Sequence, residues 1–236
     1  GARVFGGTAT GGSTAPWNTH HASDDATFDG LVVKGSRAPG ASFRGRRNLV
    51  RGIQVVDCFE GVRVLADYQD TFSNSDLFTA GKELADASSL ILVDPQIDCD
   101  EIALGVASAS MHVAGTGNYT VGDFTFVDST GSIVFDGAHY FRFVDKGYTP
   151  TNAYTSILSL RSPNSALSTA FPKAQMIVAE GALVDIDASA STASRLFGLD
   201  DDVEFIIRGT LRVKLPNGCE WMLNAASTGT VRCEGS

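Results

Sequence analysis

The residues best suited to chemistry form an acidic group at Asp94, Asp98, Asp100 and Glu101. Glycan hydrolysis requires two carboxyl groups about 5–9.5 Å apart. If Asp98 and Asp100 lie on one strand, they share a face at a separation of about 7 Å. That spacing suits an acid/base pair or a calcium site, so Asp98 and Asp100 are our candidate catalytic residues. The competing interpretation is a solvated acidic turn at Pro95.

Other reactive groups lack the spacing of known sites. The chain contains no Gly-x-Ser-x-Gly sequence and no phosphate-binding glycine loop, and residues 200–202 do not continue into an EF-hand. The four cysteines, at positions 58, 99, 219 and 233, include no Cys-x-x-Cys pair. We expect no metal site and no cofactor. Cys58 is expected to be a buried thiol, and Cys219 and Cys233 flank a predicted hairpin and could pair if the chain is exported.

Aromatic and basic residues near predicted turns suit glycan binding, because exposed rings stack on sugars and guanidinium groups bind anions. Our candidates are Trp17, Tyr148, Arg44 and Arg47. Five arginines lie between positions 37 and 51, and they either bind an acidic glycan or subunit or form local ion pairs in turns. The formal net charge of −9 argues against nucleic-acid binding.

Short apolar runs bounded by turn residues must position these groups, and they predict an all-β chain. Examples are Thr27–Lys34, Leu49–Val56, Ser89–Val93 and Ser156–Leu160. Only Ser75–Ala87 has a helical pattern. No apolar run approaches the roughly eighteen residues that a membrane span requires, so we expect no membrane insertion.

The pattern divides the chain into four parts. Residues 1–25 are expected to be a glycine-rich arm or linker of a processed or partial chain, 26–145 a β-solenoid-like region, 146–173 a turn-rich boundary and 174–236 a C-terminal β region. Gly131, Gly181, Gly209 and Gly229 each precede an alternating strand. This irregular recurrence is typical of stacked β-coils, although an antiparallel, jelly-roll-like β-sandwich would give a similar pattern.

Residues 48–65, Asn-Leu-Val-Arg-Gly-Ile-Gln-Val-Val-Asp-Cys-Phe-Glu-Gly-Val-Arg-Val-Leu, resemble one coil of a right-handed parallel β-helix of the pectate-lyase-like kind. Phe28–Gly35 resembles the preceding coil, and the pattern blurs after residue 68. Stacked coils would bury apolar residues of these runs. The predicted core is Leu31, Val33, Leu49, Ile53, Val55, Val62, Val64, Leu90, Leu92, Ile102 and Leu104.

Among such proteins, the chain is most similar to bacteriophage tailspikes and tail-fibre receptor-binding proteins. The resemblance implies a homotrimer in the virion or outside the cell, which binds bacterial surface polysaccharide and other virion proteins. Two alternatives remain open: a polysaccharide-degrading enzyme (a glycoside hydrolase or lyase) on the same scaffold, and a capsid or decoration protein with a purely assembly role.

Overall fold

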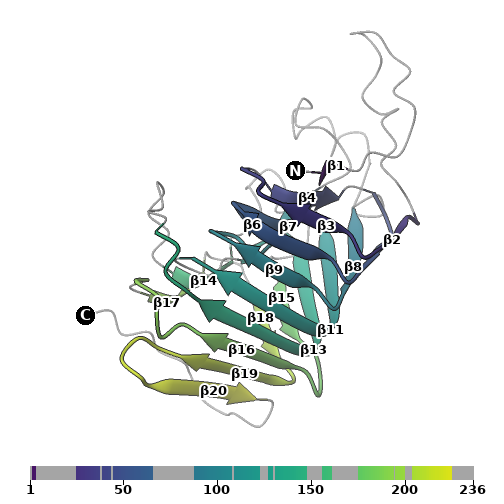
Figure 1. The fold of residues 1–236 in the computed structure, drawn as a ribbon. Coiled ribbons are helices and arrows are strands. Elements are labelled where there is room, and N and C mark those ends of the chain that lie inside the picture. Colours follow the sequence, from purple (N-terminus) through teal and green to yellow (C-terminus); the bar gives the residue numbers. More distant parts are fainter. Residues whose placement is uncertain are drawn as a thin grey trace, which may run out of the picture.

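The described part of the computed structural model is built from strands and contains no helix (Figure 1). It covers residues 2–3, 25–37, 39–43, 45–65, 88–107, 109–122, 127–129, 131–147, 156–160, 175–193, 195–199 and 204–224. The predicted helix Ser75–Ala87 lies outside these residues. None of the described segments is a helix that is long and apolar enough to span a bilayer.

The all-β prediction is therefore confirmed for the described residues. The strands, in chain order, are β1 (Ala2–Arg3), β2 (Thr27–Asp29), β3 (Val32–Lys34), β4 (Pro39–Phe43), β5 (Asn48–Arg51), β6 (Gln54–Cys58), β7 (Glu60–Leu65), β8 (Ser89–Val93), β9 (Gln96–Cys99), β10 (Leu104–Ala107), β11 (Ser110–Val121), β12 (Val127–Ser129), β13 (Ser132–Phe143), β14 (Ser156–Leu160), β15 (Gln175–Val178), β16 (Leu183–Asp187), β17 (Arg195–Leu199), β18 (Glu204–Ile207), β19 (Thr210–Lys214) and β20 (Glu220–Asn224).

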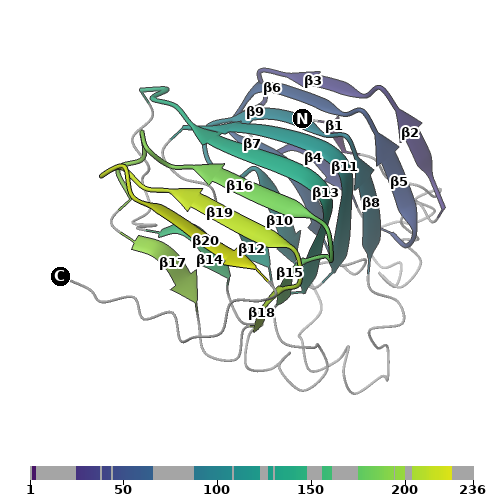
Figure 2. The ribbon, with the colours of Figure 1, turned by 90° about the horizontal axis from the view of Figure 1, so that it is seen from below.

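These strands pair almost entirely in parallel, and the described antiparallel ladder is the one between β19 and β20. The larger sheet carries β5, β8 and β15 on one side and β6, β9 and β16 on another, while β11 and β13 run through both (Figures 1 and 2). A separate sheet holds β4, β7, β10 and β12. The large sheet continues from β13 to β15 and β16 across residues 146–173.

Each strand pairs with the strand that takes the same place one repeat later. Val33 pairs with Val55, Ile97 pairs with Tyr119, and Tyr119 in turn pairs with Phe141. From β2 to β13, contacts between neighbouring repeats join residues about 22 positions apart, or about 42 positions apart where residues 66–87 intervene. Beyond β13 the partners lie 43–45 positions apart and then 27–29 positions apart. The pattern that seemed to blur after residue 68 thus resumes at β8. We missed this continuation because the intervening residues shift the spacing.

A residue with positive φ occupies the corner between the two sides of the large sheet in successive repeats. These residues are Gly30, Gly52, Asp94, Gly115 and Gly137, with φ between 50° and 106°. Glycine adopts this conformation without steric cost, and aspartate tolerates it better than most residues do. The backbone amides of Gly30 and Gly52 donate to carbonyl groups in the next repeat, so the corners stack as the strands do.

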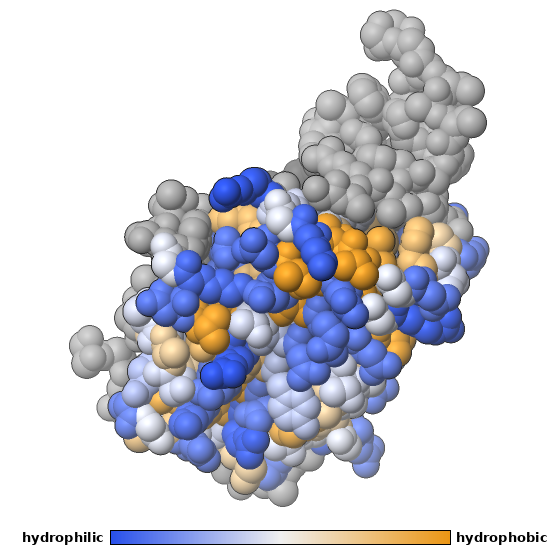
Figure 3. All heavy atoms as spheres, viewed as in Figure 1, coloured by the Kyte–Doolittle hydropathy of each residue, from blue (hydrophilic) through white to orange (hydrophobic). Residues whose placement is uncertain are grey.

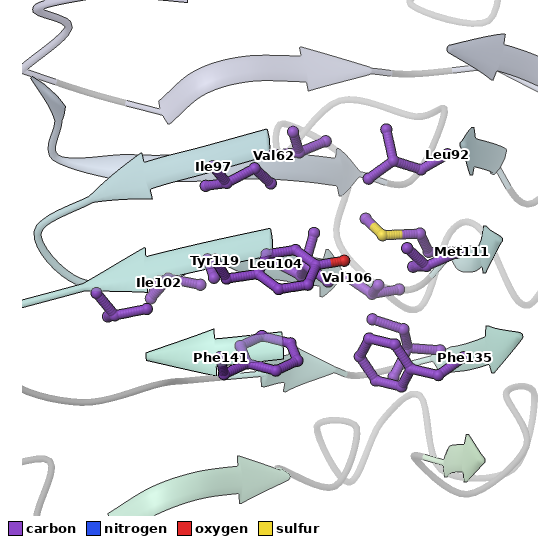
Figure 4. Packing of buried hydrophobic residues seen from close by; sticks show 14 of the residues in the cluster. Val62, Leu92, Ile97, Ile102, Leu104, Val106, Met111, Tyr119, Phe135 and Phe141 are labelled. Carbon is purple, nitrogen blue, oxygen red and sulfur yellow. The ribbon is translucent and has the colours of Figure 1, made fainter. Parts of the chain in front are cut away.

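Inward-facing side chains of all repeats form one apolar core (Figure 4). Of the predicted core residues, all but Leu31 and Leu49 are fully buried. Leu49 faces outward because its neighbours Asn48 and Val50 face inward. Tyr119 and Phe141 stack in adjacent repeats, with ring centroids 4.1 Å apart. Stacking of similar side chains in register explains why a 22-residue repeat can build a continuous core.

Candidate functional site

One outer face of the large sheet carries a regular row of polar side chains. Their neighbours along each strand, such as Val55, Ile97 and Tyr119, are buried, so the row residues point outward. Each residue of the row is the direct partner of the next. We call this set the outer polar row: Gln54, Gln96, Asn118, Tyr140, Asp185 and Arg212.

The chemistry of the outer polar row suits a ligand rich in hydroxyl groups. Its members are spaced by one strand separation, about 4.8 Å. Tyr140, in the middle, is 41% exposed, and its ring is the largest apolar surface of the row. Arg212 donates from Nε to Asp185 Oδ1 at 3.0 Å. Figure 3 shows this face as mostly hydrophilic, with an apolar area toward the N-terminal end of the stack.

A second row, of four charged residues and Thr120, runs beside the first. Asp98, Thr120, Arg142, Asp187 and Lys214 are direct partners from β9 to β19. The Ser189 hydroxyl donates a hydrogen bond to Asp187, and this bond, assisted by Lys214 and Arg142, lowers the pKa of the Asp187 carboxyl. Opposite charges thus alternate along this row, which keeps the face close to neutral.

The predicted catalytic residues lie at the end of this face, in a group that we call the corner cluster: Arg37, Asp57, Asp98, Asp100 and Lys146. Asp98 accepts from Lys146 Nζ, whose side chain is only 16% exposed. Burial lowers the pKa of Lys146, and the nearby Asp57 charge opposes this shift. The ion pair joins residues 48 positions apart and fixes the Asp98 carboxylate against the segment that follows β13.

Asp100 differs from Asp98 in its surroundings. Both flank the buried Cys99, which places them outside the core. Partial burial raises the pKa of Asp100, the charge of Asp57 raises it further, and Arg37 acts in the opposite direction. Carboxyl groups held in different environments can divide the roles of acid and base. The corner cluster therefore holds carboxyl groups whose surroundings differ.

The other predicted site residues fall elsewhere. Arg47 lies in a turn with φ 55° and donates from Nε and Nη2 to Asp25, at 2.6 and 2.7 Å. The guanidinium of Arg47 lowers the pKa of that aspartate. This local ion pair matches our interpretation of the arginines as turn residues. Trp17, Arg44 and Tyr148 lie outside the described residues.

Sequence reasoning missed the outer polar row and Lys146. Gln96, Asn118 and Tyr140 recur at the repeat length, as do Asp98, Thr120 and Arg142. A search for polar residues 22 positions apart would have found these three members of each row, but not the members beyond β13, whose spacing is longer. Nothing local marks Lys146 as the partner of Asp98.

Metal chemistry finds no support in the described part of the chain, where no three His, Cys, Asp or Glu side chains group as ligands would. Comparisons with protein-family models, curated proteins and solved structures found no match.

Proposed function

We propose that this chain is a right-handed parallel β-helix of a bacteriophage spike or fibre, in the virion or outside the cell, that binds bacterial surface glycans. The β-helix is supported by the repeated strand order, in which β5, β6 and β7 pair with β8, β9 and β10 in turn. A β-sandwich would require many antiparallel ladders, and the described strands form one. Parallel crossover connections are almost always right-handed.

Glycan binding is carried by one observation, the exposed ring of Tyr140 between Asn118 and Asp185 on a regular polar face. A sugar ring stacks on an aromatic face, and its hydroxyl groups bind amide and carboxylate groups beside it. Because the outer polar row runs along the stack, an extended polysaccharide can contact several of its residues at once. The assignment to a phage spike rests on the resemblance of residues 48–65 to β-helix coils, and it brings with it a homotrimer that contacts other virion proteins.

The test is binding to a panel of purified bacterial capsular polysaccharides and lipopolysaccharides, measured by biolayer interferometry. We expect Tyr140→Ala to weaken binding about tenfold or more, since an exposed aromatic anchor is commonly worth over 1.4 kcal/mol. Tyr140→Phe keeps the ring and should retain most of the affinity. Glu180→Ala, a change at an exposed turn residue between β15 and β16, should have no effect.

Two outcomes would contradict the proposal: no binding to any glycan of the panel, or binding that Tyr140→Ala leaves intact. If the chain assembles with itself and ignores every glycan, a purely assembly role replaces the one proposed.

A second function, glycan cleavage at the corner cluster, is favoured by the raised pKa of Asp100 beside Asp57. In the same incubations, size-exclusion chromatography reports the length of the glycan. If the parent chain shortens the glycan, and Asp100→Asn abolishes the shortening while binding persists, then this protein is an enzyme. A glycan of unchanged length leaves the corner cluster with a structural role.

A further inference from the structure

Two buried thiols lie on neighbouring repeats of the stack. Cys58 ends β6 and Cys99 ends β9, and the two residues are partners in the parallel ladder between these strands, after a register shift between Val55 and Cys58. Both side chains point into the core, with at most 1% of each residue exposed. Both are free thiols in this structure.

The surroundings of the two cysteines repeat as well. Residues 57–60 read Asp-Cys-Phe-Glu and residues 98–101 read Asp-Cys-Asp-Glu. The pattern Asp-Cys-x-Glu thus occurs at the ends of β6 and β9, in consecutive repeats. The Ser36 amide donates to Cys58 Sγ at 3.4 Å. Burial strongly raises the pKa of the Cys99 thiol, and the Glu101 amide opposes the shift by donating to it.

Residues directly opposite in adjacent parallel strands have Cα atoms about 4.8 Å apart. Disulfides span Cα separations of about 4.4–6.8 Å. The Cα separation of the two cysteines therefore falls in the range of disulfides, and both side chains lie on the core side of the sheet. Because Cys58 Sγ contacts Ser36 and Val33 in the preceding repeat, bond formation also requires this sulfur to turn toward β9.

We propose that Cys58 and Cys99 form a cross-strand disulfide when the chain folds in the presence of a small disulfide such as oxidised glutathione. One cysteine thiolate attacks the glutathione disulfide and releases reduced glutathione, which leaves a mixed disulfide. The second cysteine thiolate displaces the second glutathione. Two thiols and one oxidised glutathione thus give one protein disulfide and two reduced glutathiones.

The exchange takes place before the core closes. In the folded protein both thiols are shielded from solvent, and burial disfavours the thiolate of Cys99. While β9 docks on β6, the pairing of the two strands places the two cysteines side by side before the core closes around them. The bond then joins repeats on both sides of residues 66–87, which restricts the unfolded chain and stabilises the stack.

The experiment refolds the full chain from denaturant in a glutathione redox buffer or, in parallel, in dithiothreitol. Remaining thiols are blocked, and non-reducing peptide mapping identifies any linked cysteines. We expect Cys58 and Cys99 peptides to be joined in the first sample only, with a higher midpoint of urea unfolding. Cys219→Ser should leave the bond in place, because Cys219 lies exposed in the β19–β20 turn.

The proposal would be overturned if the blocking reagent modified Cys58 and Cys99 completely in the oxidised sample. A disulfide from either of them to another cysteine would also overturn it. Cys58→Ala and Cys99→Ala should each remove the shift in the midpoint while still folding in dithiothreitol. If either variant fails to fold, the peptide map of the unaltered chain decides alone.

Discussion

At the scale of single residues, Asp94 shows how a side chain can replace glycine at a corner. It has φ 50°, and its Oδ1 accepts a hydrogen bond from the Thr116 amide at 2.7 Å. We predict that Asp94→Ala lowers the free energy of unfolding by about 1–2 kcal/mol, because it loses this bond and places an ordinary side chain in the left-handed region. Urea denaturation followed by fluorescence measures the change.

Asp94→Asn is the matched control, since asparagine keeps an acceptor and tolerates the same φ. It should cost less than half as much as the alanine. Equal losses in the two variants would show that neither the hydrogen bond nor the backbone conformation matters at this corner.

Residue patterns also set the limit of what could be predicted for the site. Acidic residues at 98 and 100 are visible in the sequence, but their surroundings are not: Lys146 reaches Asp98 from 48 positions away, and Asp57 approaches Asp100 from the previous repeat. Tyr140 stands out only once the register places it between Asn118 and Asp185. A row made of one residue per repeat, such as the proposed glycan-binding row, has no local signature in the sequence.

At the scale of elements, the alternation of apolar and polar residues was a good guide. The predicted bounds of β8 and β14 are confirmed. Pro95 predicts an acidic turn after β8, because proline usually interrupts strands. The turn is confined to Asp94 and Pro95, and β9 begins at the next residue, Gln96. Here Pro95 occupies a corner, where its carbonyl accepts from the Asn118 amide. For β11 the sequence predicts only Met111–Ala114, and for β13 two pieces, Ser132–Phe135 and His139–Val144, because glycines interrupt both strands at the same corner.

Close contact between turns explains the glycines before β13 and β19, Gly131 and Gly209, whereas Gly181 lies in open space with φ 77°. A Cβ atom on Gly131, just before β13, would lie 1.8 Å from the carbonyl oxygen of Ala109 in the turn before β11. We predict that Gly131→Ala costs about 3 kcal/mol or more, since two backbones must separate. Gly30→Ala, in open space with φ 65°, should cost only about 1 kcal/mol of backbone strain. Thermal unfolding of both variants compares them, and similar losses would contradict the close approach.

At the scale of the whole molecule, the two outer faces of the large sheet differ in chemistry. The first bears the outer polar row. The second bears an apolar row, in which each residue pairs with the next across neighbouring strands. Its members are Leu49, Ile91, Val134, Ile177 and Ile206, and His112 lies between Ile91 and Val134. A second copy of the chain presents the same residues at the same strand spacing, so the rows of two copies match in period. Removing this apolar surface from water would favour self-association.

The proposed homotrimer is tested through Ile91, the second member of the apolar row, which is 42% exposed. We predict that light scattering gives three times the chain mass of 24.8 kDa, and that Ile91→Arg lowers the mass toward one chain because charges would face each other at the axis. Circular dichroism should remain unchanged, and Tyr140→Ala should stay trimeric, since its face points elsewhere. A monomeric parent chain, or an Ile91→Arg variant that keeps the full mass, would exclude this face as the contact between copies. In that case, the outer polar row of a single chain would have to bind the glycan without help from other copies.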